Sequence, residues 1–255
     1  MIRTLGVMKK WAGRKNNVDG DTHIQLDVAS LLHLSPDGPH YASVNEGTMK
    51  QYRYIGKDGT FDYEQYRKAQ VRANKKKIEW QWTTDPAIKF LAKNIVRILG
   101  KSPKHGLCHG TRRGLEQQSF AKHIPGCKVL GTEISDTADQ FPHTIQWDFH
   151  DVKPEWVGKF DFVYSNSWDH SYDPVKLFSA WMSELRPGGI CLLEHTRSQW
   201  RVSESDPLGM TVKQLTMLLK NLGYNVIEII KDGPKVGQCW KEEGFETVYL
   251  VIKRK

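Results

Sequence analysis

The feature that most constrains the fold is a glycine-containing loop within residues 104–149. The loop follows His105 to Cys108, a short, apolar-leaning run that predicts a strand, and it contains Gly110 and Gly114. Glycines let the backbone pass close to a ligand there, because they carry no Cβ. Leu115 to His123 can then form a helix. The order strand, glycine loop and helix predicts the first half of a βαβ unit, with its loop at the carboxyl edge of a parallel sheet.

Two acidic residues follow at the ends of the next two predicted strands. Glu133 lies near the end of the buried run Lys128 to Ile134, and Asp148 follows the short run Thr144 to Trp147. An acid about 20 residues beyond a glycine loop, at the tip of the next strand, is placed to accept hydrogen bonds from a ribose diol. The loop and the two acids along one sheet edge therefore predict a nucleoside site.

These segments resemble the cofactor half of class I S-adenosylmethionine-dependent methyltransferases. The resemblance continues through FDFVYSNSWDHSYDPVKLF and ELRPGGICLLEH, so it covers roughly residues 104–195. It implies an α/β fold with a Rossmann-like, doubly wound, mostly parallel seven-stranded sheet and an antiparallel last strand. We expect this domain to occupy residues 84–255, after an N-terminal α+β extension at residues 1–83 that could shape a substrate pocket or lid.

The later segments resemble the small-molecule branch of the family that is often called type 11. In that branch the fourth strand ends near an acid–His pair, which Asp169 and His170 match. A Leu-x-Pro-Gly-Gly turn then leads into strand five, and Leu185 to Gly189 matches it.

The glycine loop departs from the family pattern at two positions. An acid usually lies two residues before the first glycine, where this chain has Cys108, and Arg112 replaces the middle glycine. Arg112 could pair with the cofactor carboxylate or with an anionic substrate. A salt bridge to Glu116, at helical spacing, is an equal alternative.

The resemblance implies S-adenosylmethionine as the cofactor and S-adenosylhomocysteine as the product. Glu133 would accept hydrogen bonds from the ribose, and Asp148 would meet the adenine amino group. Ile134 or Phe149 would pack on the adenine ring, and Asn166 lies where strand four passes the methionine end. The remaining cofactor contacts are assigned to the loop residues Cys108, His109, Gly110, Thr111, Arg112 and Gly114.

The candidates for catalysis follow strands four and five. A bound acceptor must be oriented for an in-line displacement, and an oxygen acceptor benefits from a nearby base. His170 and His195 are the candidate bases, with Asp169 to orient His170, although each histidine could equally be a packed or capping residue. Trp82 and Tyr172 are tentative substrate contacts. SNSWDH stands where amino-methylating enzymes carry an Asn-Pro-Pro-Tyr-type motif, which favours O-methylation.

The charge distribution suggests an alternative partner. The net charge is +8; residues 1–100 carry 17 basic and 10 acidic side chains, whereas residues 101–255 carry 20 and 19. The basic front half could contact nucleic acid, as in an RNA methyltransferase, but no recognisable RNA-binding module precedes the core. A small-molecule or saccharide acceptor is therefore favoured. A non-catalytic binding protein is the third hypothesis, because the glycine loop departs from the pattern.

Other classes of protein are disfavoured by composition. No apolar run approaches the roughly 20 residues of a membrane span, and the first residues lack the apolar core of a signal peptide, so we expect a cytoplasmic protein. No Cys-x-x-Cys pair or tight His/Asp spacing suggests a metal, and we predict none. The oligomeric state stays open. The four cysteines, expected to be reduced, are Cys108, Cys127, Cys191 and Cys239.

The front region is predicted from turn signals and helical spacing. Gln51 to Phe61 looks like a hairpin, Asp62 to Trp80 a helix, and Thr83 to Pro86 the start of another. Trp80 and Trp82 could form a lid over the cofactor or bury against the sheet. A group of rings is expected to pack as a satellite core rather than line a pocket: Tyr52, Tyr54, Phe61, Tyr63 and Tyr66.

Overall fold

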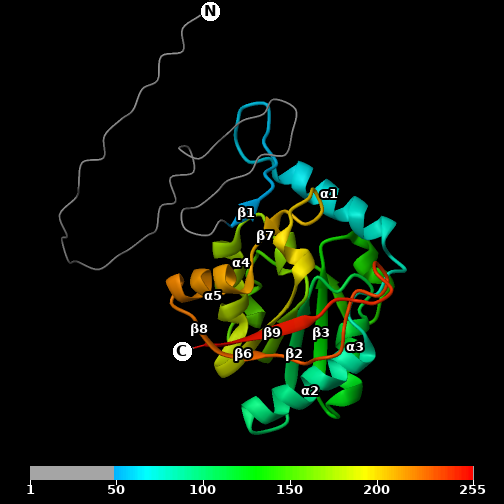
Figure 1. The fold of residues 1–255 in the computed structure, drawn as a ribbon, viewed down its shortest axis with the longest axis vertical. Coiled ribbons are helices and arrows are strands. Elements are labelled where there is room, and N and C mark those ends of the chain that lie inside the picture. Colours follow the sequence, from blue (N-terminus) through cyan, green and yellow to red (C-terminus); the bar gives the residue numbers. More distant parts are fainter. Residues whose placement is uncertain (1–48, 255) are drawn as a thin grey trace, which may run out of the picture.

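A computed structural model describes residues 49–254, with a seven-stranded sheet at their centre (Figure 1). The strand order is β4-β3-β2-β5-β6-β9-β8. β9 runs antiparallel to both neighbours, and the other pairs are parallel. The predicted fold is confirmed. The strands are β2 (His105–His109), β3 (Lys128–Glu133), β4 (Thr144–Gln146), β5 (Phe160–Ser165), β6 (Leu185–Thr196), β8 (Asn225–Ile230) and β9 (Thr247–Lys253).

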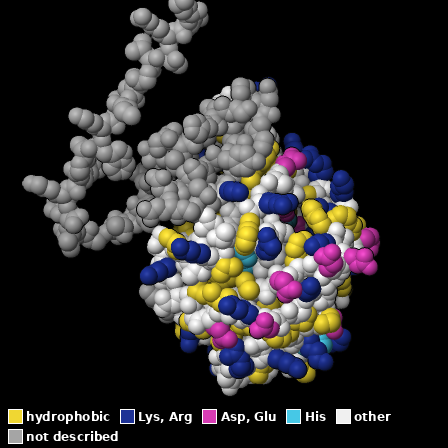
Figure 2. Space-filling view, in the orientation of Figure 1, with side chains coloured by type: hydrophobic (Ala, Val, Ile, Leu, Met, Phe, Trp, Pro, Cys, Tyr) yellow, Lys and Arg dark blue, Asp and Glu magenta, His cyan; other side chains and the backbone are white. Residues whose placement is uncertain are grey.

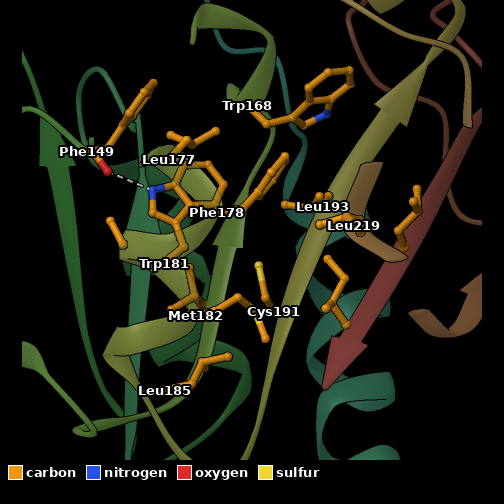
Figure 3. Close-up of a cluster of buried hydrophobic side chains, with 14 of the residues drawn as sticks. Phe149, Trp168, Leu177, Phe178, Trp181, Met182, Leu185, Cys191, Leu193 and Leu219 are labelled. Atoms are coloured by element: carbon orange, nitrogen blue, oxygen red, sulfur yellow. Dashed lines mark hydrogen bonds between the residues drawn. The ribbon is translucent and has the colours of Figure 1, made fainter. Parts of the chain in front are cut away.

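Helices cover both faces of the sheet. α2 and α3 pack on one face around Leu91 and Phe120. α4 and α5 pack on the other face, where Phe178 and Trp181 are fully buried (Figure 3). The helices are α1 (Tyr63–Lys76), α2 (Asp85–Leu99), α3 (Leu115–His123), α4 (Pro174–Glu184) and α5 (Val212–Asn221).

The alternation of side chains along β6 builds both cores at once. Ile190 and Leu192 join the core under α2 and α3, whereas Cys191 and Leu193 join the core under α4 and α5. Successive side chains of a strand point to opposite faces, so a strand that is covered on both sides must be apolar at every position. This explains why the central strands appear in the sequence as continuous hydrophobic runs.

Local sequence signals set the helix ends, as predicted. The side chain of Thr84 caps α2, Pro86 lies in its first turn, and Gly100 ends it with a φ of 66°. Asp173 caps α4 by accepting hydrogen bonds from two backbone amides of its first turn. α1 begins at its cap Asp62 but ends at Lys76, four residues before the predicted end.

The described part of the N-terminal region lies against the carboxyl edge of the sheet. β1 (Lys50–Gln51) pairs with β7 (Leu208–Gly209), and Ile55 bridges Phe61 in the predicted hairpin. Tyr54 and Tyr66 form a small core with the neighbouring rings, as predicted, although Tyr66 also lines a void at the strand ends. Residues 1–48 lie outside the described residues, so the division at residue 83 stays a prediction. Within residues 49–254, no helix is long and apolar enough to cross a membrane.

Candidate active site

The candidate site lies at the carboxyl ends of β2, β3 and β5, where the strand order reverses. Its centre is the loop after β2, in which Gly110 has a φ of 71°. A Cβ on Gly110 would lie 2.7 Å from the Cβ of Ser167, in the loop after β5. Glycine is therefore required both by the backbone conformation and by the close approach of the second loop. In open α/β sheets this crevice is where ligands bind.

Glu133, at the end of β3, faces the glycine loop. Its Oε2 accepts a hydrogen bond from the Arg112 amide at 3.0 Å, and its Oε1 accepts one from the Ser135 amide at 3.1 Å. Burial raises the pKa of this carboxyl group. Each carboxylate oxygen keeps a second lone pair, so Glu133 is fixed in place and can still accept hydrogen bonds from a ligand.

A small void of about 50 Å³ lies between the strand ends and α1. Asp148 lines it and is held on both oxygens, because His150 Nδ1 donates to Oδ1 at 2.7 Å and the Tyr63 hydroxyl donates to Oδ2 at 2.8 Å. Tyr63 belongs to α1, so this helix closes over the strand ends. The void has room for only a few water molecules.

A larger cavity of about 700 Å³ adjoins this void. The two spaces share Lys77, Gly110, Arg112, Ser167 and His170 in their linings. The volume is within the range of pockets that hold small molecules. The site therefore consists of a narrow part under α1 and a wide part that opens from it.

Tryptophans and basic side chains form the outer wall of the large cavity. Trp80, Trp200 and Trp240 are 42%, 40% and 65% exposed. Lys77 Nζ lies 5.9 Å from a ring centroid of Trp240, and Arg197 Cζ lies 5.4 Å from one of Trp200. Figure 2 shows Lys and Arg side chains intermingled with hydrophobic ones on the face that carries α1. The wall can therefore offer ring faces and positive charge to the same ligand.

The positive charge of this wall is only partly neutralised. Lys235 pairs with Glu246, and Lys241 pairs with Glu243. The remaining basic side chains of the cavity have no carboxylate within salt-bridge distance among residues 49–254: Lys77, Arg112, Arg197 and Arg201.

Glu194 of β6 is a fully buried acid that lines neither space but contacts Trp82, which lines the large cavity. Its side chain accepts hydrogen bonds from Trp82 Nε1 at 2.8 Å, from the Tyr164 hydroxyl at 2.8 Å and from the Thr83 hydroxyl at 3.1 Å. Burial raises the pKa of this carboxyl group to about 7. Glu194 thus anchors the segment between α1 and α2 to the sheet.

Glu116, in the first turn of α3, is a second buried acid, and it lines the large cavity. Its Oε1 accepts long hydrogen bonds from Gln81 Nε2 at 3.3 Å and Asn166 Nδ2 at 3.4 Å. Its Oε2 has no hydrogen-bond partner among the residues that the structure describes. Burial raises the pKa of this carboxyl group to about 7 as well.

Comparisons with known proteins bear on this arrangement. No protein-family model matches the chain, and no curated protein is similar in sequence. A solved structure of a Burkholderia thailandensis 1,6-didemethyltoxoflavin-N1-methyltransferase, with bound 1,6-didemethyltoxoflavin and S-adenosylhomocysteine, is similar with a TM-score of 0.58. It shares 13% identity, and the alignment covers 88% of this chain and 99% of that one. The chain has the class I methyltransferase fold.

A second solved structure supports the same fold. It is a chain of a complex that contains the Haloferax volcanii Trm112 methyltransferase activator, with a TM-score of 0.50 and 14% identity. The alignment covers 76% of this chain and 99% of that one.

The methyltransferase fold brings most of the predicted cofactor residues together. The small void is lined by Gly110, Arg112, Glu133, Ile134, Asp148 and Phe149. The larger cavity is lined by Trp82, Gly110, Thr111, Arg112 and Asn166. Their roles toward a ligand remain predictions.

Three predicted loop residues do not line either space. Cys108 is buried in the core under α2 and α3. His109 points to the opposite face, where Nε2 lies 2.8 Å from Glu184 and Nδ1 lies 2.9 Å from the Thr132 hydroxyl. Gly114 precedes α3 with a φ of 76°, so it serves the turn. The strand and the helix start direct these residues away from the cavity, and their contacts with a ligand stay predictions.

His195 and Tyr172 are also displaced from their predicted roles. His195 Nε2 donates to the Met210 carbonyl at 2.9 Å, its ring stacks on Trp168, and burial lowers its pKa. His195 lies in the core and lines neither space, so its role as a base stays a prediction. Tyr172 packs against Tyr66 and against His150, at a centroid distance of 3.9 Å, and lines neither space.

His170 does line both spaces, but Asp169 does not orient it. His170 Nδ1 lies 2.9 Å from Gln70 Oε1, and Nε2 lies 3.3 Å from Asp206 Oδ1. Asp169 instead accepts a hydrogen bond from Gln199 Nε2 at 3.3 Å. Adjacent residues in the tight turn after β5 point in different directions, which is why the acid–His pair of the sequence is not a pair in space.

The sequence analysis missed Glu116 as a site residue and considered it only as a partner of Arg112. The Arg112 guanidinium donates to the Trp80 carbonyl at 2.6 Å, and Arg112 forms no ion pair with Glu116. The available signal was position, because an acid two residues after Gly114 falls in the first turn of the helix that follows the glycine loop.

Asp169→Asn is expected to change how stability depends on pH. Burial raises the pKa of Asp169 well above its ordinary value, and Asp206 adds to the shift. Above the unfolded pKa of about 3.9, the folded state keeps a proton that the unfolded state has lost, so this group lowers stability as pH rises toward its folded pKa. Urea unfolding between pH 4 and 7 should show the variant gaining stability relative to wild type as pH rises. A difference that does not vary with pH would contradict this account.

Proposed function

We propose that the protein is an S-adenosylmethionine-dependent methyltransferase that methylates an oxygen of a small-molecule acceptor. The observation that carries the proposal is the pair of adjoining spaces. A narrow void, bounded by Gly110, Glu133 and Asp148, adjoins a separate cavity of about 700 Å³. A transferase needs two neighbouring sites of this kind, because donor and acceptor must be bound together.

The residues present fit the cofactor. Gly110 gives the loop its left-handed turn beside Ser167, and Glu133 keeps free lone pairs for a ribose diol. The narrow void cannot hold a nucleoside while Tyr63 of α1 contacts Asp148. Cofactor binding on this proposal requires α1 to move outward. When bound, S-adenosylmethionine supplies an activated methyl group.

His170 is the proposed proton acceptor for the acceptor hydroxyl. It lies where the two spaces meet, and burial lowers its pKa to about 4, so the ring is neutral near pH 7. A neutral imidazole that donates from Nδ1 to Gln70 Oε1 presents a lone pair at Nε2. Asp206, 3.3 Å from Nε2, would stabilise the imidazolium that forms.

The wall of the large cavity supports an acceptor that combines a ring with an acidic group. Exposed Trp80, Trp200 and Trp240 offer faces for an aromatic or sugar ring. Arg197 and Arg201 offer positive charge that no described carboxylate neutralises. The same features would suit a phosphorylated or carboxylated glycan or phenol.

The test is methyl transfer from S-adenosylmethionine labelled on the methyl group. The panel pairs hydroxylated phenols and sugars with their acidic derivatives and with amine analogues, and includes a single-stranded RNA. We expect label in acidic, hydroxylated small molecules, and we expect Arg197→Gln with Arg201→Gln to raise KM for them. Lys213→Gln with Lys220→Gln, two exposed changes on α5, is the charge-matched control. Label only in amines or only in RNA would contradict the proposed acceptor, and no transfer to any member would count against the enzyme.

A further inference from the structure

Glu116 is a buried acid whose hydrogen bonding is incomplete. Its side chain is 5% exposed and lines the large cavity, and Oε2 has no partner among residues 49–254. The two hydrogen bonds to Oε1 are long, at 3.3 and 3.4 Å, and come from neutral amides. A buried, ionised carboxylate without a cation or strong donors is costly, so such a group either stays protonated or awaits a positively charged partner.

Among residues 49–254, no cationic side chain forms an ion pair with Glu116. The nearest guanidinium, that of Arg112, donates to the Trp80 carbonyl instead. The ionisable groups that face Glu116 are Arg112 in the loop, Cys108 of β2, Tyr164 of β5 and Glu194 of β6. Three of these four are acids. Because no cation among residues 49–254 pairs with Glu116, a ligand is the candidate source of one.

The position of Glu116 identifies which part of a ligand that is. It lines the large cavity together with Gly110, Thr111 and Asn166, whereas Glu133, the proposed ribose contact, lines the small void. The Thr111 hydroxyl is also buried and without a hydrogen-bond partner among the described residues. Cys108 of β2 is buried in the core under α2 and α3, and it is close enough to Glu116 for their charges to interact. The acid of this part of the cavity is therefore supplied by α3.

We propose that Glu116, in the first turn of α3, binds the α-ammonium group of the cofactor's methionine portion. This inference rests on the proposed function. The carboxylate would accept N–H···O hydrogen bonds through the unpartnered Oε2, and Thr111 and Asn166 would complete the polar surroundings. Glu116 then discriminates in favour of ligands that carry the amino-acid portion.

The test compares two ligands that differ in that portion. S-adenosylhomocysteine carries the amino acid, whereas 5′-methylthioadenosine has the same nucleoside and thioether without it. Calorimetric titration of both ligands into wild type, Glu116→Gln and Glu116→Asp provides the comparison. Glu184→Gln, a buried acid on the opposite face of the sheet, is the matched control. Thermal unfolding of each variant confirms that it folds.

We expect Glu116→Gln to weaken S-adenosylhomocysteine binding about ten- to a hundredfold, as for the loss of a charge-assisted hydrogen bond. The affinity for methylthioadenosine should change by less than about threefold, because this ligand has no ammonium group to contact Glu116. Glu116→Asp, which keeps the charge, should recover part of the loss, and Glu184→Gln should behave as wild type with both ligands.

Lowering the pH gives a second readout. Burial raises the pKa of Glu116 to about 7, so below that pH the group must lose a proton before it can pair with an ammonium. Affinity for S-adenosylhomocysteine should fall by up to about tenfold per pH unit between pH 7 and 5. In Glu116→Gln, the ratio of the affinities for S-adenosylhomocysteine and methylthioadenosine should no longer change with pH.

The outcomes separate the two claims. If neither ligand binds wild type, the proposed function fails. If both bind and Glu116→Gln weakens them equally or not at all, the proposed function stands and the ammonium assignment is overturned. A variant that binds S-adenosylhomocysteine normally but transfers no methyl group would also overturn it, because Glu116 would then act on the acceptor.

Discussion

Trp181→Ala is expected to lower the free energy of unfolding by about 3–5 kcal/mol, the range for truncating a large buried aromatic side chain. Trp181 is fully buried on α4, stacks on His109 at 4.8 Å, and donates from Nε1 to the Phe149 carbonyl at 3.0 Å (Figure 3). The substitution leaves a cavity and an unsatisfied carbonyl group. Because Phe149 also lines the small void, the substitution should disturb the candidate site as well.

Denaturant unfolding measures this effect. Val175→Ala is a control on the same helix, because Val175 is 39% exposed and its truncation should change stability by about 0.5 kcal/mol or less. Equal stability losses in the two variants would show that α4 is not packed as described.

Glu133→Ala is expected to weaken S-adenosylhomocysteine binding tenfold or more, since hydrogen bonds to a charged group are lost. The substitution also releases the amides of Arg112 and Ser135, which position the glycine loop and the start of the next turn. Glu133→Gln keeps an acceptor oxygen, so it should lose less. Calorimetric titration gives the affinities.

The matched control for this prediction is Glu228→Ala, which removes a surface acid of β8 that pairs with Arg97. It should leave affinity unchanged. Unchanged affinity in Glu133→Ala would show that Glu133 does not face the ribose.

The fold could be predicted because its signals are local or periodic. Thr84, Pro86 and Gly100 mark the ends of α2 through hydrogen bonding and backbone conformation within a few residues. The apolar runs of β5 and β6 indicate strands covered on both faces. The glycine loop and Glu133 were found because they occupy fixed places along one βαβ unit.

Site residues could be predicted only where their position at the end of a strand determines which way the side chain points. Glu194 and His195 are adjacent on β6, and a strand sends neighbours to opposite faces. Glu194 faces Trp82 at the site, whereas His195 faces Trp168 in the core. The sequence analysis named His195 as a candidate base and did not consider Glu194, because the sequence does not state which face each residue takes.

Contacts between distant segments were beyond sequence reasoning. The Tyr63 hydroxyl meets Asp148 across 85 positions, and Asp206 reaches His170 from a loop that no local pattern defines. Glu116 was missed for a related reason, because its importance comes from the polar contacts it lacks, and these are visible only when the surrounding elements are packed.

The most direct test of the central claim is calorimetric titration of the full chain with S-adenosylhomocysteine, followed by hydrogen exchange of α1 with and without the ligand. We predict binding at a single site with micromolar affinity, together with changed exchange in α1, because the small void of about 50 Å³ cannot accept a nucleoside until that helix moves. Absence of binding to both S-adenosylmethionine and S-adenosylhomocysteine would contradict the account.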